Sequence, residues 1–290
     1  MKVLIHDRLE AVGAPVWDGL VAATRLRSPF LSWTWQREWA RVFAEDRRLE
    51  IHCVEDESGG LVALLPLCEA APGTWQILGG ADVSDYLDLM AVQGREEEAW
   101  MALLQSRTAA RVEWQLHAVP AASTTVTALP QLAAAYGLTA SVAVEERCPV
   151  LALPSSWETY LASLSGKHRH ELMRKMRRLH RDAPDARVAS ASAPAEIEAR
   201  LGEFFHLHRR SHAGKARFMD SRMEQFFRRV LMAFTERGAA RLWFLDTPAG
   251  AIAAFVTIEW DGTVGLYNSG FDPESTPARW PLSAGRKPAG

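Results

Sequence analysis

The sequence predicts an α/β (α+β) protein with two tandem domains of mixed, mostly antiparallel sheets flanked by helices, on three observations. Helical and strand-like segments are interspersed along the 290 residues, so neither an all-α nor an all-β fold fits. A pattern of strand, glycine-bearing turn and strand occurs in both halves. Pro154-Ser155-Ser156 separates the halves and opens a new helix. We therefore expect domains at residues 1–153 and 154–274 and an irregular tail at 275–290.

Composition and charge exclude several classes of protein. The chain is 48% hydrophobic and 23% charged, as globular proteins are, and its net charge of -2 argues against a basic coat for nucleic acid. Its three cysteines are scattered without a CxxC pair, which favours reduced thiols over disulfides or zinc. Apolar runs such as Leu61–Cys68 are too short to cross a bilayer. We expect a cytoplasmic protein with no membrane span.

In the first half, the opening segment is predicted to be helical. Trp35, Trp39 and Phe43 recur every four residues, which places them on one stripe of a helix that faces the core. The predicted helices are 16–23, 33–43, 96–106 and 129–136. The predicted strands are 49–55, 61–67, 75–78, 111–117, 138–145 and 150–153.

In the second half, a long helix is predicted from Trp157 to His180, with a possible kink near Gly166. The other predicted helices are 195–211 and 221–237. The predicted strands are 187–192, 240–245, 251–260 and 264–268.

An internal repeat relates the two halves. A constant shift of 190 residues, without a gap, superposes Gly60 on Gly250, Ala63 on Ala253 and Gly80 on Gly270. The first copy continues for about seventy residues after its last matched glycine, to the domain boundary. Only twenty residues follow that glycine in the second copy. We therefore expect an incomplete second domain that lacks its closing strands and exposes a sheet edge, as a truncated reading frame would produce.

Several stretches, in this order, resemble the tandem GNAT-like proteins, which are often described as cellulose-biosynthesis (CelD-type) acetyltransferases and are related to the Fem-type peptidoglycan aminoacyltransferases. They are Ser28–Trp35, Asp85–Asp88, the basic helix Lys167–Leu179, Leu207–Ser211 with Gly214-Lys215, and Asn268–Glu274. The resemblance covers about residues 25 to 274. It implies two GNAT-like domains, acetyl-CoA or another acyl-CoA as co-substrate, and oxyanion donors on a splayed pair of central strands. The Ser-Pro-Gly element that follows in that family is replaced here by Thr276-Pro277-Ala278.

The helix from Lys167 to Arg181 holds seven Lys or Arg residues and one acid, Glu171. Its Leu172, Met176 and Leu179 follow helical spacing and are expected to face the core. Clustered like charges repel one another, so the basic face either clamps phosphates or an acidic sugar, or is a solvated face neutralised elsewhere. The candidate anion-binding residues are Lys167, Arg169, Arg174, Arg177, Arg178, Arg209, Lys215 and Tyr86.

Acyl transfer needs a base for the nucleophile and an acid for the leaving thiolate. The candidate catalytic residues are Tyr267, Glu259, Asp85 and His208, with His206 as a further base and Tyr86 as a further acid. His208 and His212 are four residues apart, as metal ligands on a helix can be. No carboxylate completes a HExxH motif and the neighbours are basic, so we expect no metal.

Three functional hypotheses follow. The first is a coenzyme-A-dependent acyltransferase acting on an amine or hydroxyl of a sugar or cell-envelope precursor. The second is a Fem-type transferase that uses aminoacyl-tRNA and would need the same basic helix. The third is a non-catalytic interaction protein or an inactive truncated product, motivated by the expected open sheet edge.

Overall fold

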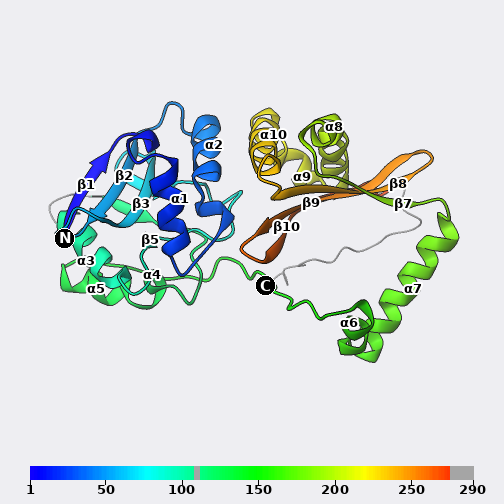
Figure 1. The fold of residues 1–290 in the computed structure, drawn as a ribbon, viewed down its shortest axis with the longest axis horizontal. Coiled ribbons are helices and arrows are strands. Elements are labelled where there is room, and N and C mark those ends of the chain that lie inside the picture. Colours follow the sequence, from blue (N-terminus) through cyan, green and yellow to red (C-terminus); the bar gives the residue numbers. More distant parts are fainter. Residues whose placement is uncertain (108–111, 275–290) are drawn as a thin grey trace. The chain divides into compact units, whose positions relative to one another are not determined.

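The computed structural model describes residues 1–107 and 112–274, and the chain divides into two compact units (Figure 1). The first unit runs from Met1 to Cys148, with the turn Trp260–Thr263 grouped with it, and the second runs from Pro149 onward. Each unit is a sheet flanked by helices, which confirms the predicted fold class. The predicted tail at 275–290 lies outside the described residues.

In the first unit, the described strands form one sheet in the order β1-β2-β3-β4-β6, with β5 paired to β3. Neighbours are antiparallel except β6, which runs parallel to β4. The strands are β1 (Lys2–His6), β2 (Leu49–Glu55), β3 (Leu61–Ala71), β4 (Thr74–Ile77), β5 (Met90–Ala91) and β6 (Glu113–Gln115). The helices are α1 (Ala14–Ala23), α2 (Trp33–Phe43), α3 (Glu96–Arg107), α4 (Thr124–Thr127) and α5 (Leu129–Ala135), with 3₁₀ turns at Leu9–Ala11 and Pro29–Leu31.

Helix α2 shows why the local sequence folds as predicted. The Ser32 side chain accepts a hydrogen bond from Trp35 N and so caps the helix. Trp35 and Trp39 are buried, in agreement with the predicted aromatic stripe, and Trp35 Nε1 donates to Ser84 Oγ over 2.9 Å. The stripe therefore serves the core of the first unit.

In the second unit, the described strands form a sheet in the order β10-β9-β8-β7, with β10 at the edge of its described part. Along β8, alternate residues Ala240, Leu242 and Phe244 are buried, and α10 packs on this strand. The strands are β7 (Arg187–Ala191), β8 (Ala240–Thr247), β9 (Gly250–Trp260) and β10 (Thr263–Phe271). The helices are α6 (Trp157–Ser163), α7 (Gly166–Asp182), α8 (Pro194–Ser211), α9 (Ala213–Phe218) and α10 (Ser221–Thr235).

The two units repeat one topology. The order β1-α1-α2-β2-β3-β4 matches β7-α8-α10-β8-β9-β10, and each sheet lists these strands in the same sequence. Both first hairpins carry an irregularity at the same place, between Val54 and Glu55 and between Leu245 and Asp246. The predicted repeat is confirmed, but not without a gap: Ala63 pairs with Val54 whereas Ala253 pairs with Leu245, so the second hairpin is one residue shorter.

Three details of the sequence prediction are wrong. The first segment begins with a strand, β1, which pairs with β2 and is the counterpart of β7. The predicted strands at 138–145 and 150–153 are irregular, because an alternating apolar pattern forms a strand only where it finds a sheet edge to pair with. The apolar stripe of α7 does not face a core, since no residue of this helix is buried.

No helix within residues 1–107 and 112–274 is both long enough and apolar enough to cross a bilayer.

Candidate active site

In the second unit, the end of α8, helix α9 and the end of β10 meet in one place. Phe271 N donates a hydrogen bond to Ser211 Oγ over 2.9 Å, and this hydroxyl donates to Leu207 O over 2.8 Å. At Gly270 an added Cβ would lie 2.3 Å from His208 N, so a residue without a side chain is required there. The junction brings together stretches that the sequence keeps far apart.

Lys215 supplies the cation of this junction. Its Nζ donates a hydrogen bond to Ser269 O and lies 3.5 Å from Ser269 Oγ. Burial lowers the pKa of Lys215, because desolvation disfavours the charged form. Among the described residues no carboxylate forms an ion pair with Lys215, so its charge is met by a carbonyl and a hydroxyl.

His208 lies next to this lysine and is 1% exposed. Its ring packs against Phe204 and Phe218, at centroid distances of 5.9 and 5.8 Å. Burial, with a smaller contribution from Lys215, lowers the pKa of His208 to about 4, against an opposing hydrogen bond from Asn268. Its Nδ1 is buried and has no hydrogen-bond partner within the described part of the chain. The imidazole is therefore neutral near neutral pH.

Tyr267 lies on β10, two residues before Ser269. Its ring stacks on Phe227 of α10, with ring centroids 5.3 Å apart and an interplanar angle of 27°. This contact holds the phenol on the helix side of the sheet.

Two arginines of α8 brace the junction. Arg209 forms an ion pair with Glu224 of α10, so this predicted anion-binding residue already has a protein partner. Arg210 Nη2 lies 3.0 Å from Asp272 Oδ1 and 2.7 Å from Glu274 Oε2, which ties the end of β10 to α8.

A cavity of about 660 Å³ opens beside the junction in the second unit. Leu207 of α8 lines it and also accepts the Ser211 hydrogen bond, while Asp272 lines it and is held by Arg210. The other lining residues are Asp182 at the end of α7, residues 183–186, His206 and the hairpin 247–252. The volume is that of a small-molecule site.

Glu259, a predicted base, does not join this junction. It lies at the opposite end of β9, where its half-exposed carboxylate is 3.8 Å from Arg241. His206 is exposed on α8 and lines the cavity rather than the hydrogen-bonded junction.

Asp85 and Tyr86 belong to the first unit. Desolvation of its carboxyl group and the nearby Glu146 raise the pKa of Asp85, although the residue as a whole is exposed. Burial, followed by a hydrogen bond with Cys148, raises the pKa of Tyr86 to about 12. These two residues form a separate polar group.

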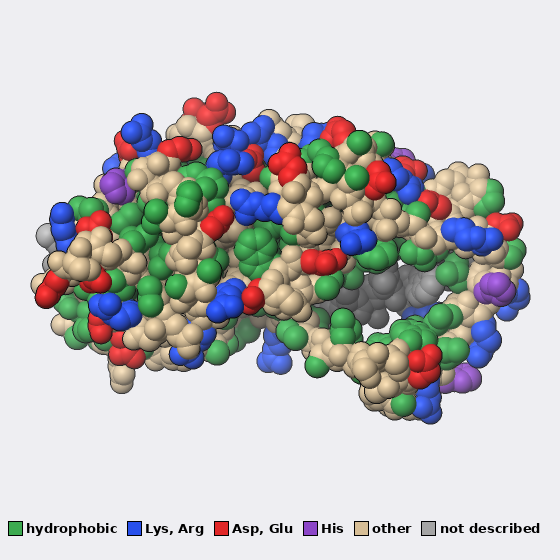
Figure 2. Space-filling view, viewed as in Figure 1, with side chains coloured by type: hydrophobic (Ala, Val, Ile, Leu, Met, Phe, Trp, Pro, Cys, Tyr) green, Lys and Arg blue, Asp and Glu red, His purple; other side chains and the backbone are tan. Residues whose placement is uncertain are grey.

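The basic residues of α7 do not converge on one point. Arg174 makes two 2.8 Å hydrogen bonds to Glu171, and Arg178 Nε lies 3.2 Å from Asp182. The remaining predicted residues, Lys167, Arg169 and Arg177, are exposed and form no ion pair with another described residue. Figure 2 shows blue and purple basic side chains along this helix.

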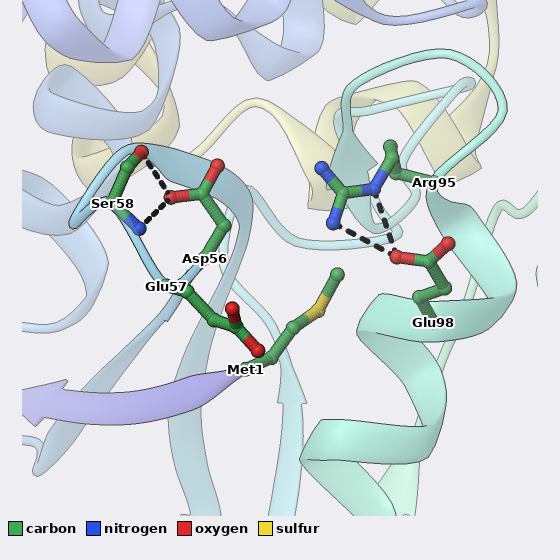
Figure 3. A pocket seen from close by; sticks show the side chains of 6 residues that line it. All are labelled: Met1, Asp56, Glu57, Ser58, Arg95 and Glu98. Atoms are coloured by element: carbon green, nitrogen blue, oxygen red, sulfur yellow. Dashed lines mark hydrogen bonds and ion pairs between the residues drawn. The ribbon is translucent and has the colours of Figure 1, made fainter.

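The first unit has its own cavity, of about 480 Å³, lined by Met1, Asp56, Glu57, Ser58, Arg95 and Glu98 (Figure 3). Asp56 Oδ1 accepts hydrogen bonds from Ser58 N and Ser58 Oγ, and Arg95 is paired with Glu98. Because these groups satisfy one another at the surface, this cavity is a weaker candidate than the second-unit junction.

Sequence reasoning named His208, Lys215 and Tyr267 but gave no role to Ser211 or Ser269. These two serines lie inside stretches that carry the family resemblance. The sequence offers one clue to them: each serine lies close in the chain to a predicted site residue. The contact itself cannot be predicted, because Lys215 and Ser269 are 54 residues apart in the chain.

Comparisons with known proteins bear on this junction. Residues 166–286 match the family described as "Acetyltransferase (GNAT) domain", a span that contains α8, α9 and β10. No curated protein matches the chain.

Solved structures share the fold. The crystal structure of FemX has a TM-score of 0.60 and 12% identity, covering 95% of this chain and 81% of that one. A conserved protein of unknown function from Bacteroides thetaiotaomicron has a TM-score of 0.52 and 13% identity, covering 94% of this chain and 81% of that one. At such identities the likeness shows a shared fold and not an activity.

Proposed function

We propose that the chain transfers an acyl group from an acyl-CoA to an acceptor, because residues 166–286 match the family described as "Acetyltransferase (GNAT) domain" and the chain shares the fold of FemX. The acceptor class is an amine or hydroxyl of a sugar or cell-envelope precursor, which follows from the family resemblance of the sequence. The reaction is assigned to the junction of α8, α9 and β10.

One observation carries this assignment: Lys215 is partly buried and has no carboxylate partner among the described residues. Burying a cation costs free energy unless an opposite charge compensates it, so such a group is expected where a ligand supplies that charge. A thioester oxyanion or a phosphate of an acyl-CoA meets this requirement. The 660 Å³ cavity shares Leu207 and Asp272 with the junction and offers room for a small molecule there.

The chemistry divides among three side chains. Attack of the acceptor's amine or hydroxyl on the thioester carbonyl creates an oxyanion, which the Lys215 ammonium stabilises, and the acceptor's proton passes to water. Collapse breaks the carbon–sulfur bond and releases a thiolate, which the Tyr267 hydroxyl protonates, and water returns a proton to the phenolate. His208, with a pKa of about 4, is too weak a base to take the acceptor's proton efficiently at neutral pH. We assign it a positioning role, through its hydrogen bond with Asn268 beside the strand end.

The test compares two matched substitutions on α9. Lys215→Gln removes the cation but keeps a hydrogen-bond donor, whereas Arg217→Gln removes an exposed cation two residues away. Release of free thiol from acetyl-CoA is measured with a panel of amines and amino sugars, and binding is measured by calorimetry. We expect kcat/KM to fall by about a hundredfold in Lys215→Gln, as for loss of one oxyanion donor, and to stay within twofold of wild type in Arg217→Gln.

Equal activity of the two variants would refute the assignment to Lys215. Failure of the wild-type chain to bind acetyl-CoA would refute the donor class. Aminoacyl-tRNA is therefore tested in parallel, and salt-sensitive binding of it in place of acetyl-CoA would favour the Fem-type reaction.

A further inference from the structure

The region around α6 and α7 exposes an unusual amount of apolar surface. Neither helix has a buried residue. In the segment that leads into α6, Val150 is 85% and Leu153 75% exposed, and Trp157 at the start of α6 is 47% exposed. We call residues 150–182 the α6–α7 segment. Apolar side chains gathered on a surface in this way mark an interaction site.

Helix α7 is also amphipathic. Leu172, Met173, Met176 and Leu179 fall on one stripe at helical spacing, and Met176 is 41% exposed. The opposite side carries most of the basic residues, with blue and purple side chains visible along the helix in Figure 2. A helix whose apolar stripe is partly exposed, with no buried member, and whose other face is strongly basic is typical of one that lies in a membrane interface.

The charges of α7 suit binding to an anionic membrane surface. Its seventeen residues include seven Lys or Arg against two acids, Glu171 and Asp182. These acids engage Arg174, Lys175, Arg178 and Arg181, which leaves Lys167, Arg169 and Arg177 without an ion pair among the described residues. At helical spacing Arg169 lies on the apolar stripe and Arg177 next to it, and unpaired cations so placed fit a surface that is both anionic and able to accept apolar side chains.

We propose that the α6–α7 segment binds the surface of an anionic membrane, with the apolar stripe of α7 inserted at the interface and its free cations on lipid headgroups. Trp157 and Tyr160 of α6, whose rings lie 5.4 Å apart, join the same interface, where amphipathic aromatic side chains are favoured. A nucleic acid would use the charges but would leave the apolar stripe in water. The proposal does not rest on acyl transfer.

The first experiment tests the apolar stripe with the full chain. Flotation is measured with vesicles of phosphatidylcholine alone and with vesicles that also contain about 40% phosphatidylglycerol, whose negative surface potential attracts a polybasic segment. Leu172→Gln/Met176→Gln is compared with the control Val16→Gln/Met101→Gln, which changes exposed apolar residues of the first unit. We expect wild type and control to float with the anionic vesicles only, and the α7 variant to bind them at least tenfold more weakly.

The second experiment tests the charges. Arg169→Gln/Arg177→Gln should weaken binding to anionic vesicles by about tenfold or more, whereas Arg25→Gln/Arg217→Gln, at exposed positions elsewhere, should change it less than twofold. Binding to anionic vesicles should also fall as salt is raised.

Three results would overturn the proposal. One is failure of the wild-type chain to float with either vesicle. Another is vesicle binding that survives Leu172→Gln/Met176→Gln, which would indicate a site for soluble polyanions. The third is a loss of vesicle binding in Leu172→Gln/Met176→Gln that comes with a large loss of thermal stability, which would indicate that the stripe docks within the protein.

Discussion

Replacing Gly270 by alanine should destabilise the second unit, although the change adds one methyl group. The new Cβ would lie 2.3 Å from His208 N, 2.6 Å from His208 Cα and 2.6 Å from Leu207 C. All three are backbone atoms within helix α8, so none can move aside by a side-chain rotation. Either α8 or the end of β10 must shift, and the Ser211–Phe271 hydrogen bond joins these two elements.

The magnitude follows from what has to move. Overpacking a close contact costs about 1–3 kcal/mol, and weakening the Ser211–Phe271 hydrogen bond adds about 1 kcal/mol. We therefore expect the free energy of unfolding of the second unit to fall by about 2–4 kcal/mol. Gly202 in the interior of α8 is the matched control, because nothing lies within 4 Å of its added Cβ. Gly202→Ala should stabilise the helix by about 1 kcal/mol.

The assay must report on the second unit, because two units need not unfold in one transition. Hydrogen exchange of peptides from α8 and β10, measured by mass spectrometry in increasing guanidinium, gives the local free energy of opening. Gly270→Ala should lower this free energy and Gly202→Ala should raise it. A Gly270→Ala protein whose α8 peptides exchange as slowly as those of wild type would refute the close approach of α8 and β10.

Two further predictions concern buried polar groups. The pKa values of His52 and His208 are lowered to about 4 by burial, so the unfolded chain binds more protons between pH 6.5 and 4 and stability is lost as pH falls through that window. At pH 5 each histidine lowers the stability of its own unit by about 2 kcal/mol, which urea unfolding as a function of pH should detect. His208→Gln should remove this loss in the second unit and leave that of the first unit unchanged. Asp88 accepts hydrogen bonds from the Ser123 and Thr125 hydroxyls, so Asp88→Ala should lower the urea midpoint of the first unit by an amount equivalent to about 2 kcal/mol, and an unchanged midpoint would contradict this role.

The sequence predicts most helices and hairpin strands because their patterns are local. The predicted strand 49–55 coincides with β2, and the helix predicted at 33–43 coincides with α2. The segment 138–153 has a similar apolar alternation but forms no strand, since pairing depends on a neighbour that the local pattern cannot specify. For the same reason the sequence does not predict β1: its five residues form a strand by pairing with β2, about fifty residues away.

The candidate site is less predictable than the fold. The residue types that acyl transfer needs identify Glu259 and His208 equally well, and only the fold separates them. Glu259 lies near the exposed C-terminal end of β9, beside Arg241, whereas His208 is buried against Gly270. The deciding contacts join α8 and α9 to β10, across a long stretch of chain that no local pattern spans.

The internal repeat gives an independent reason to assign Lys215 more than a structural role. The 190-residue shift that relates the third strands places Gly79 on Ser269. In the first unit the Gly79 carbonyl accepts a hydrogen bond from the Ser84 hydroxyl over 2.9 Å, whereas in the second unit the Ser269 carbonyl accepts one from the Lys215 ammonium. A neutral hydroxyl thus satisfies the same carbonyl in the first copy, so capping this position does not require a charge. The second copy places a desolvated cation there at a cost in folding free energy, and the Lys215→Gln protein should therefore be at least as stable as wild type while losing activity.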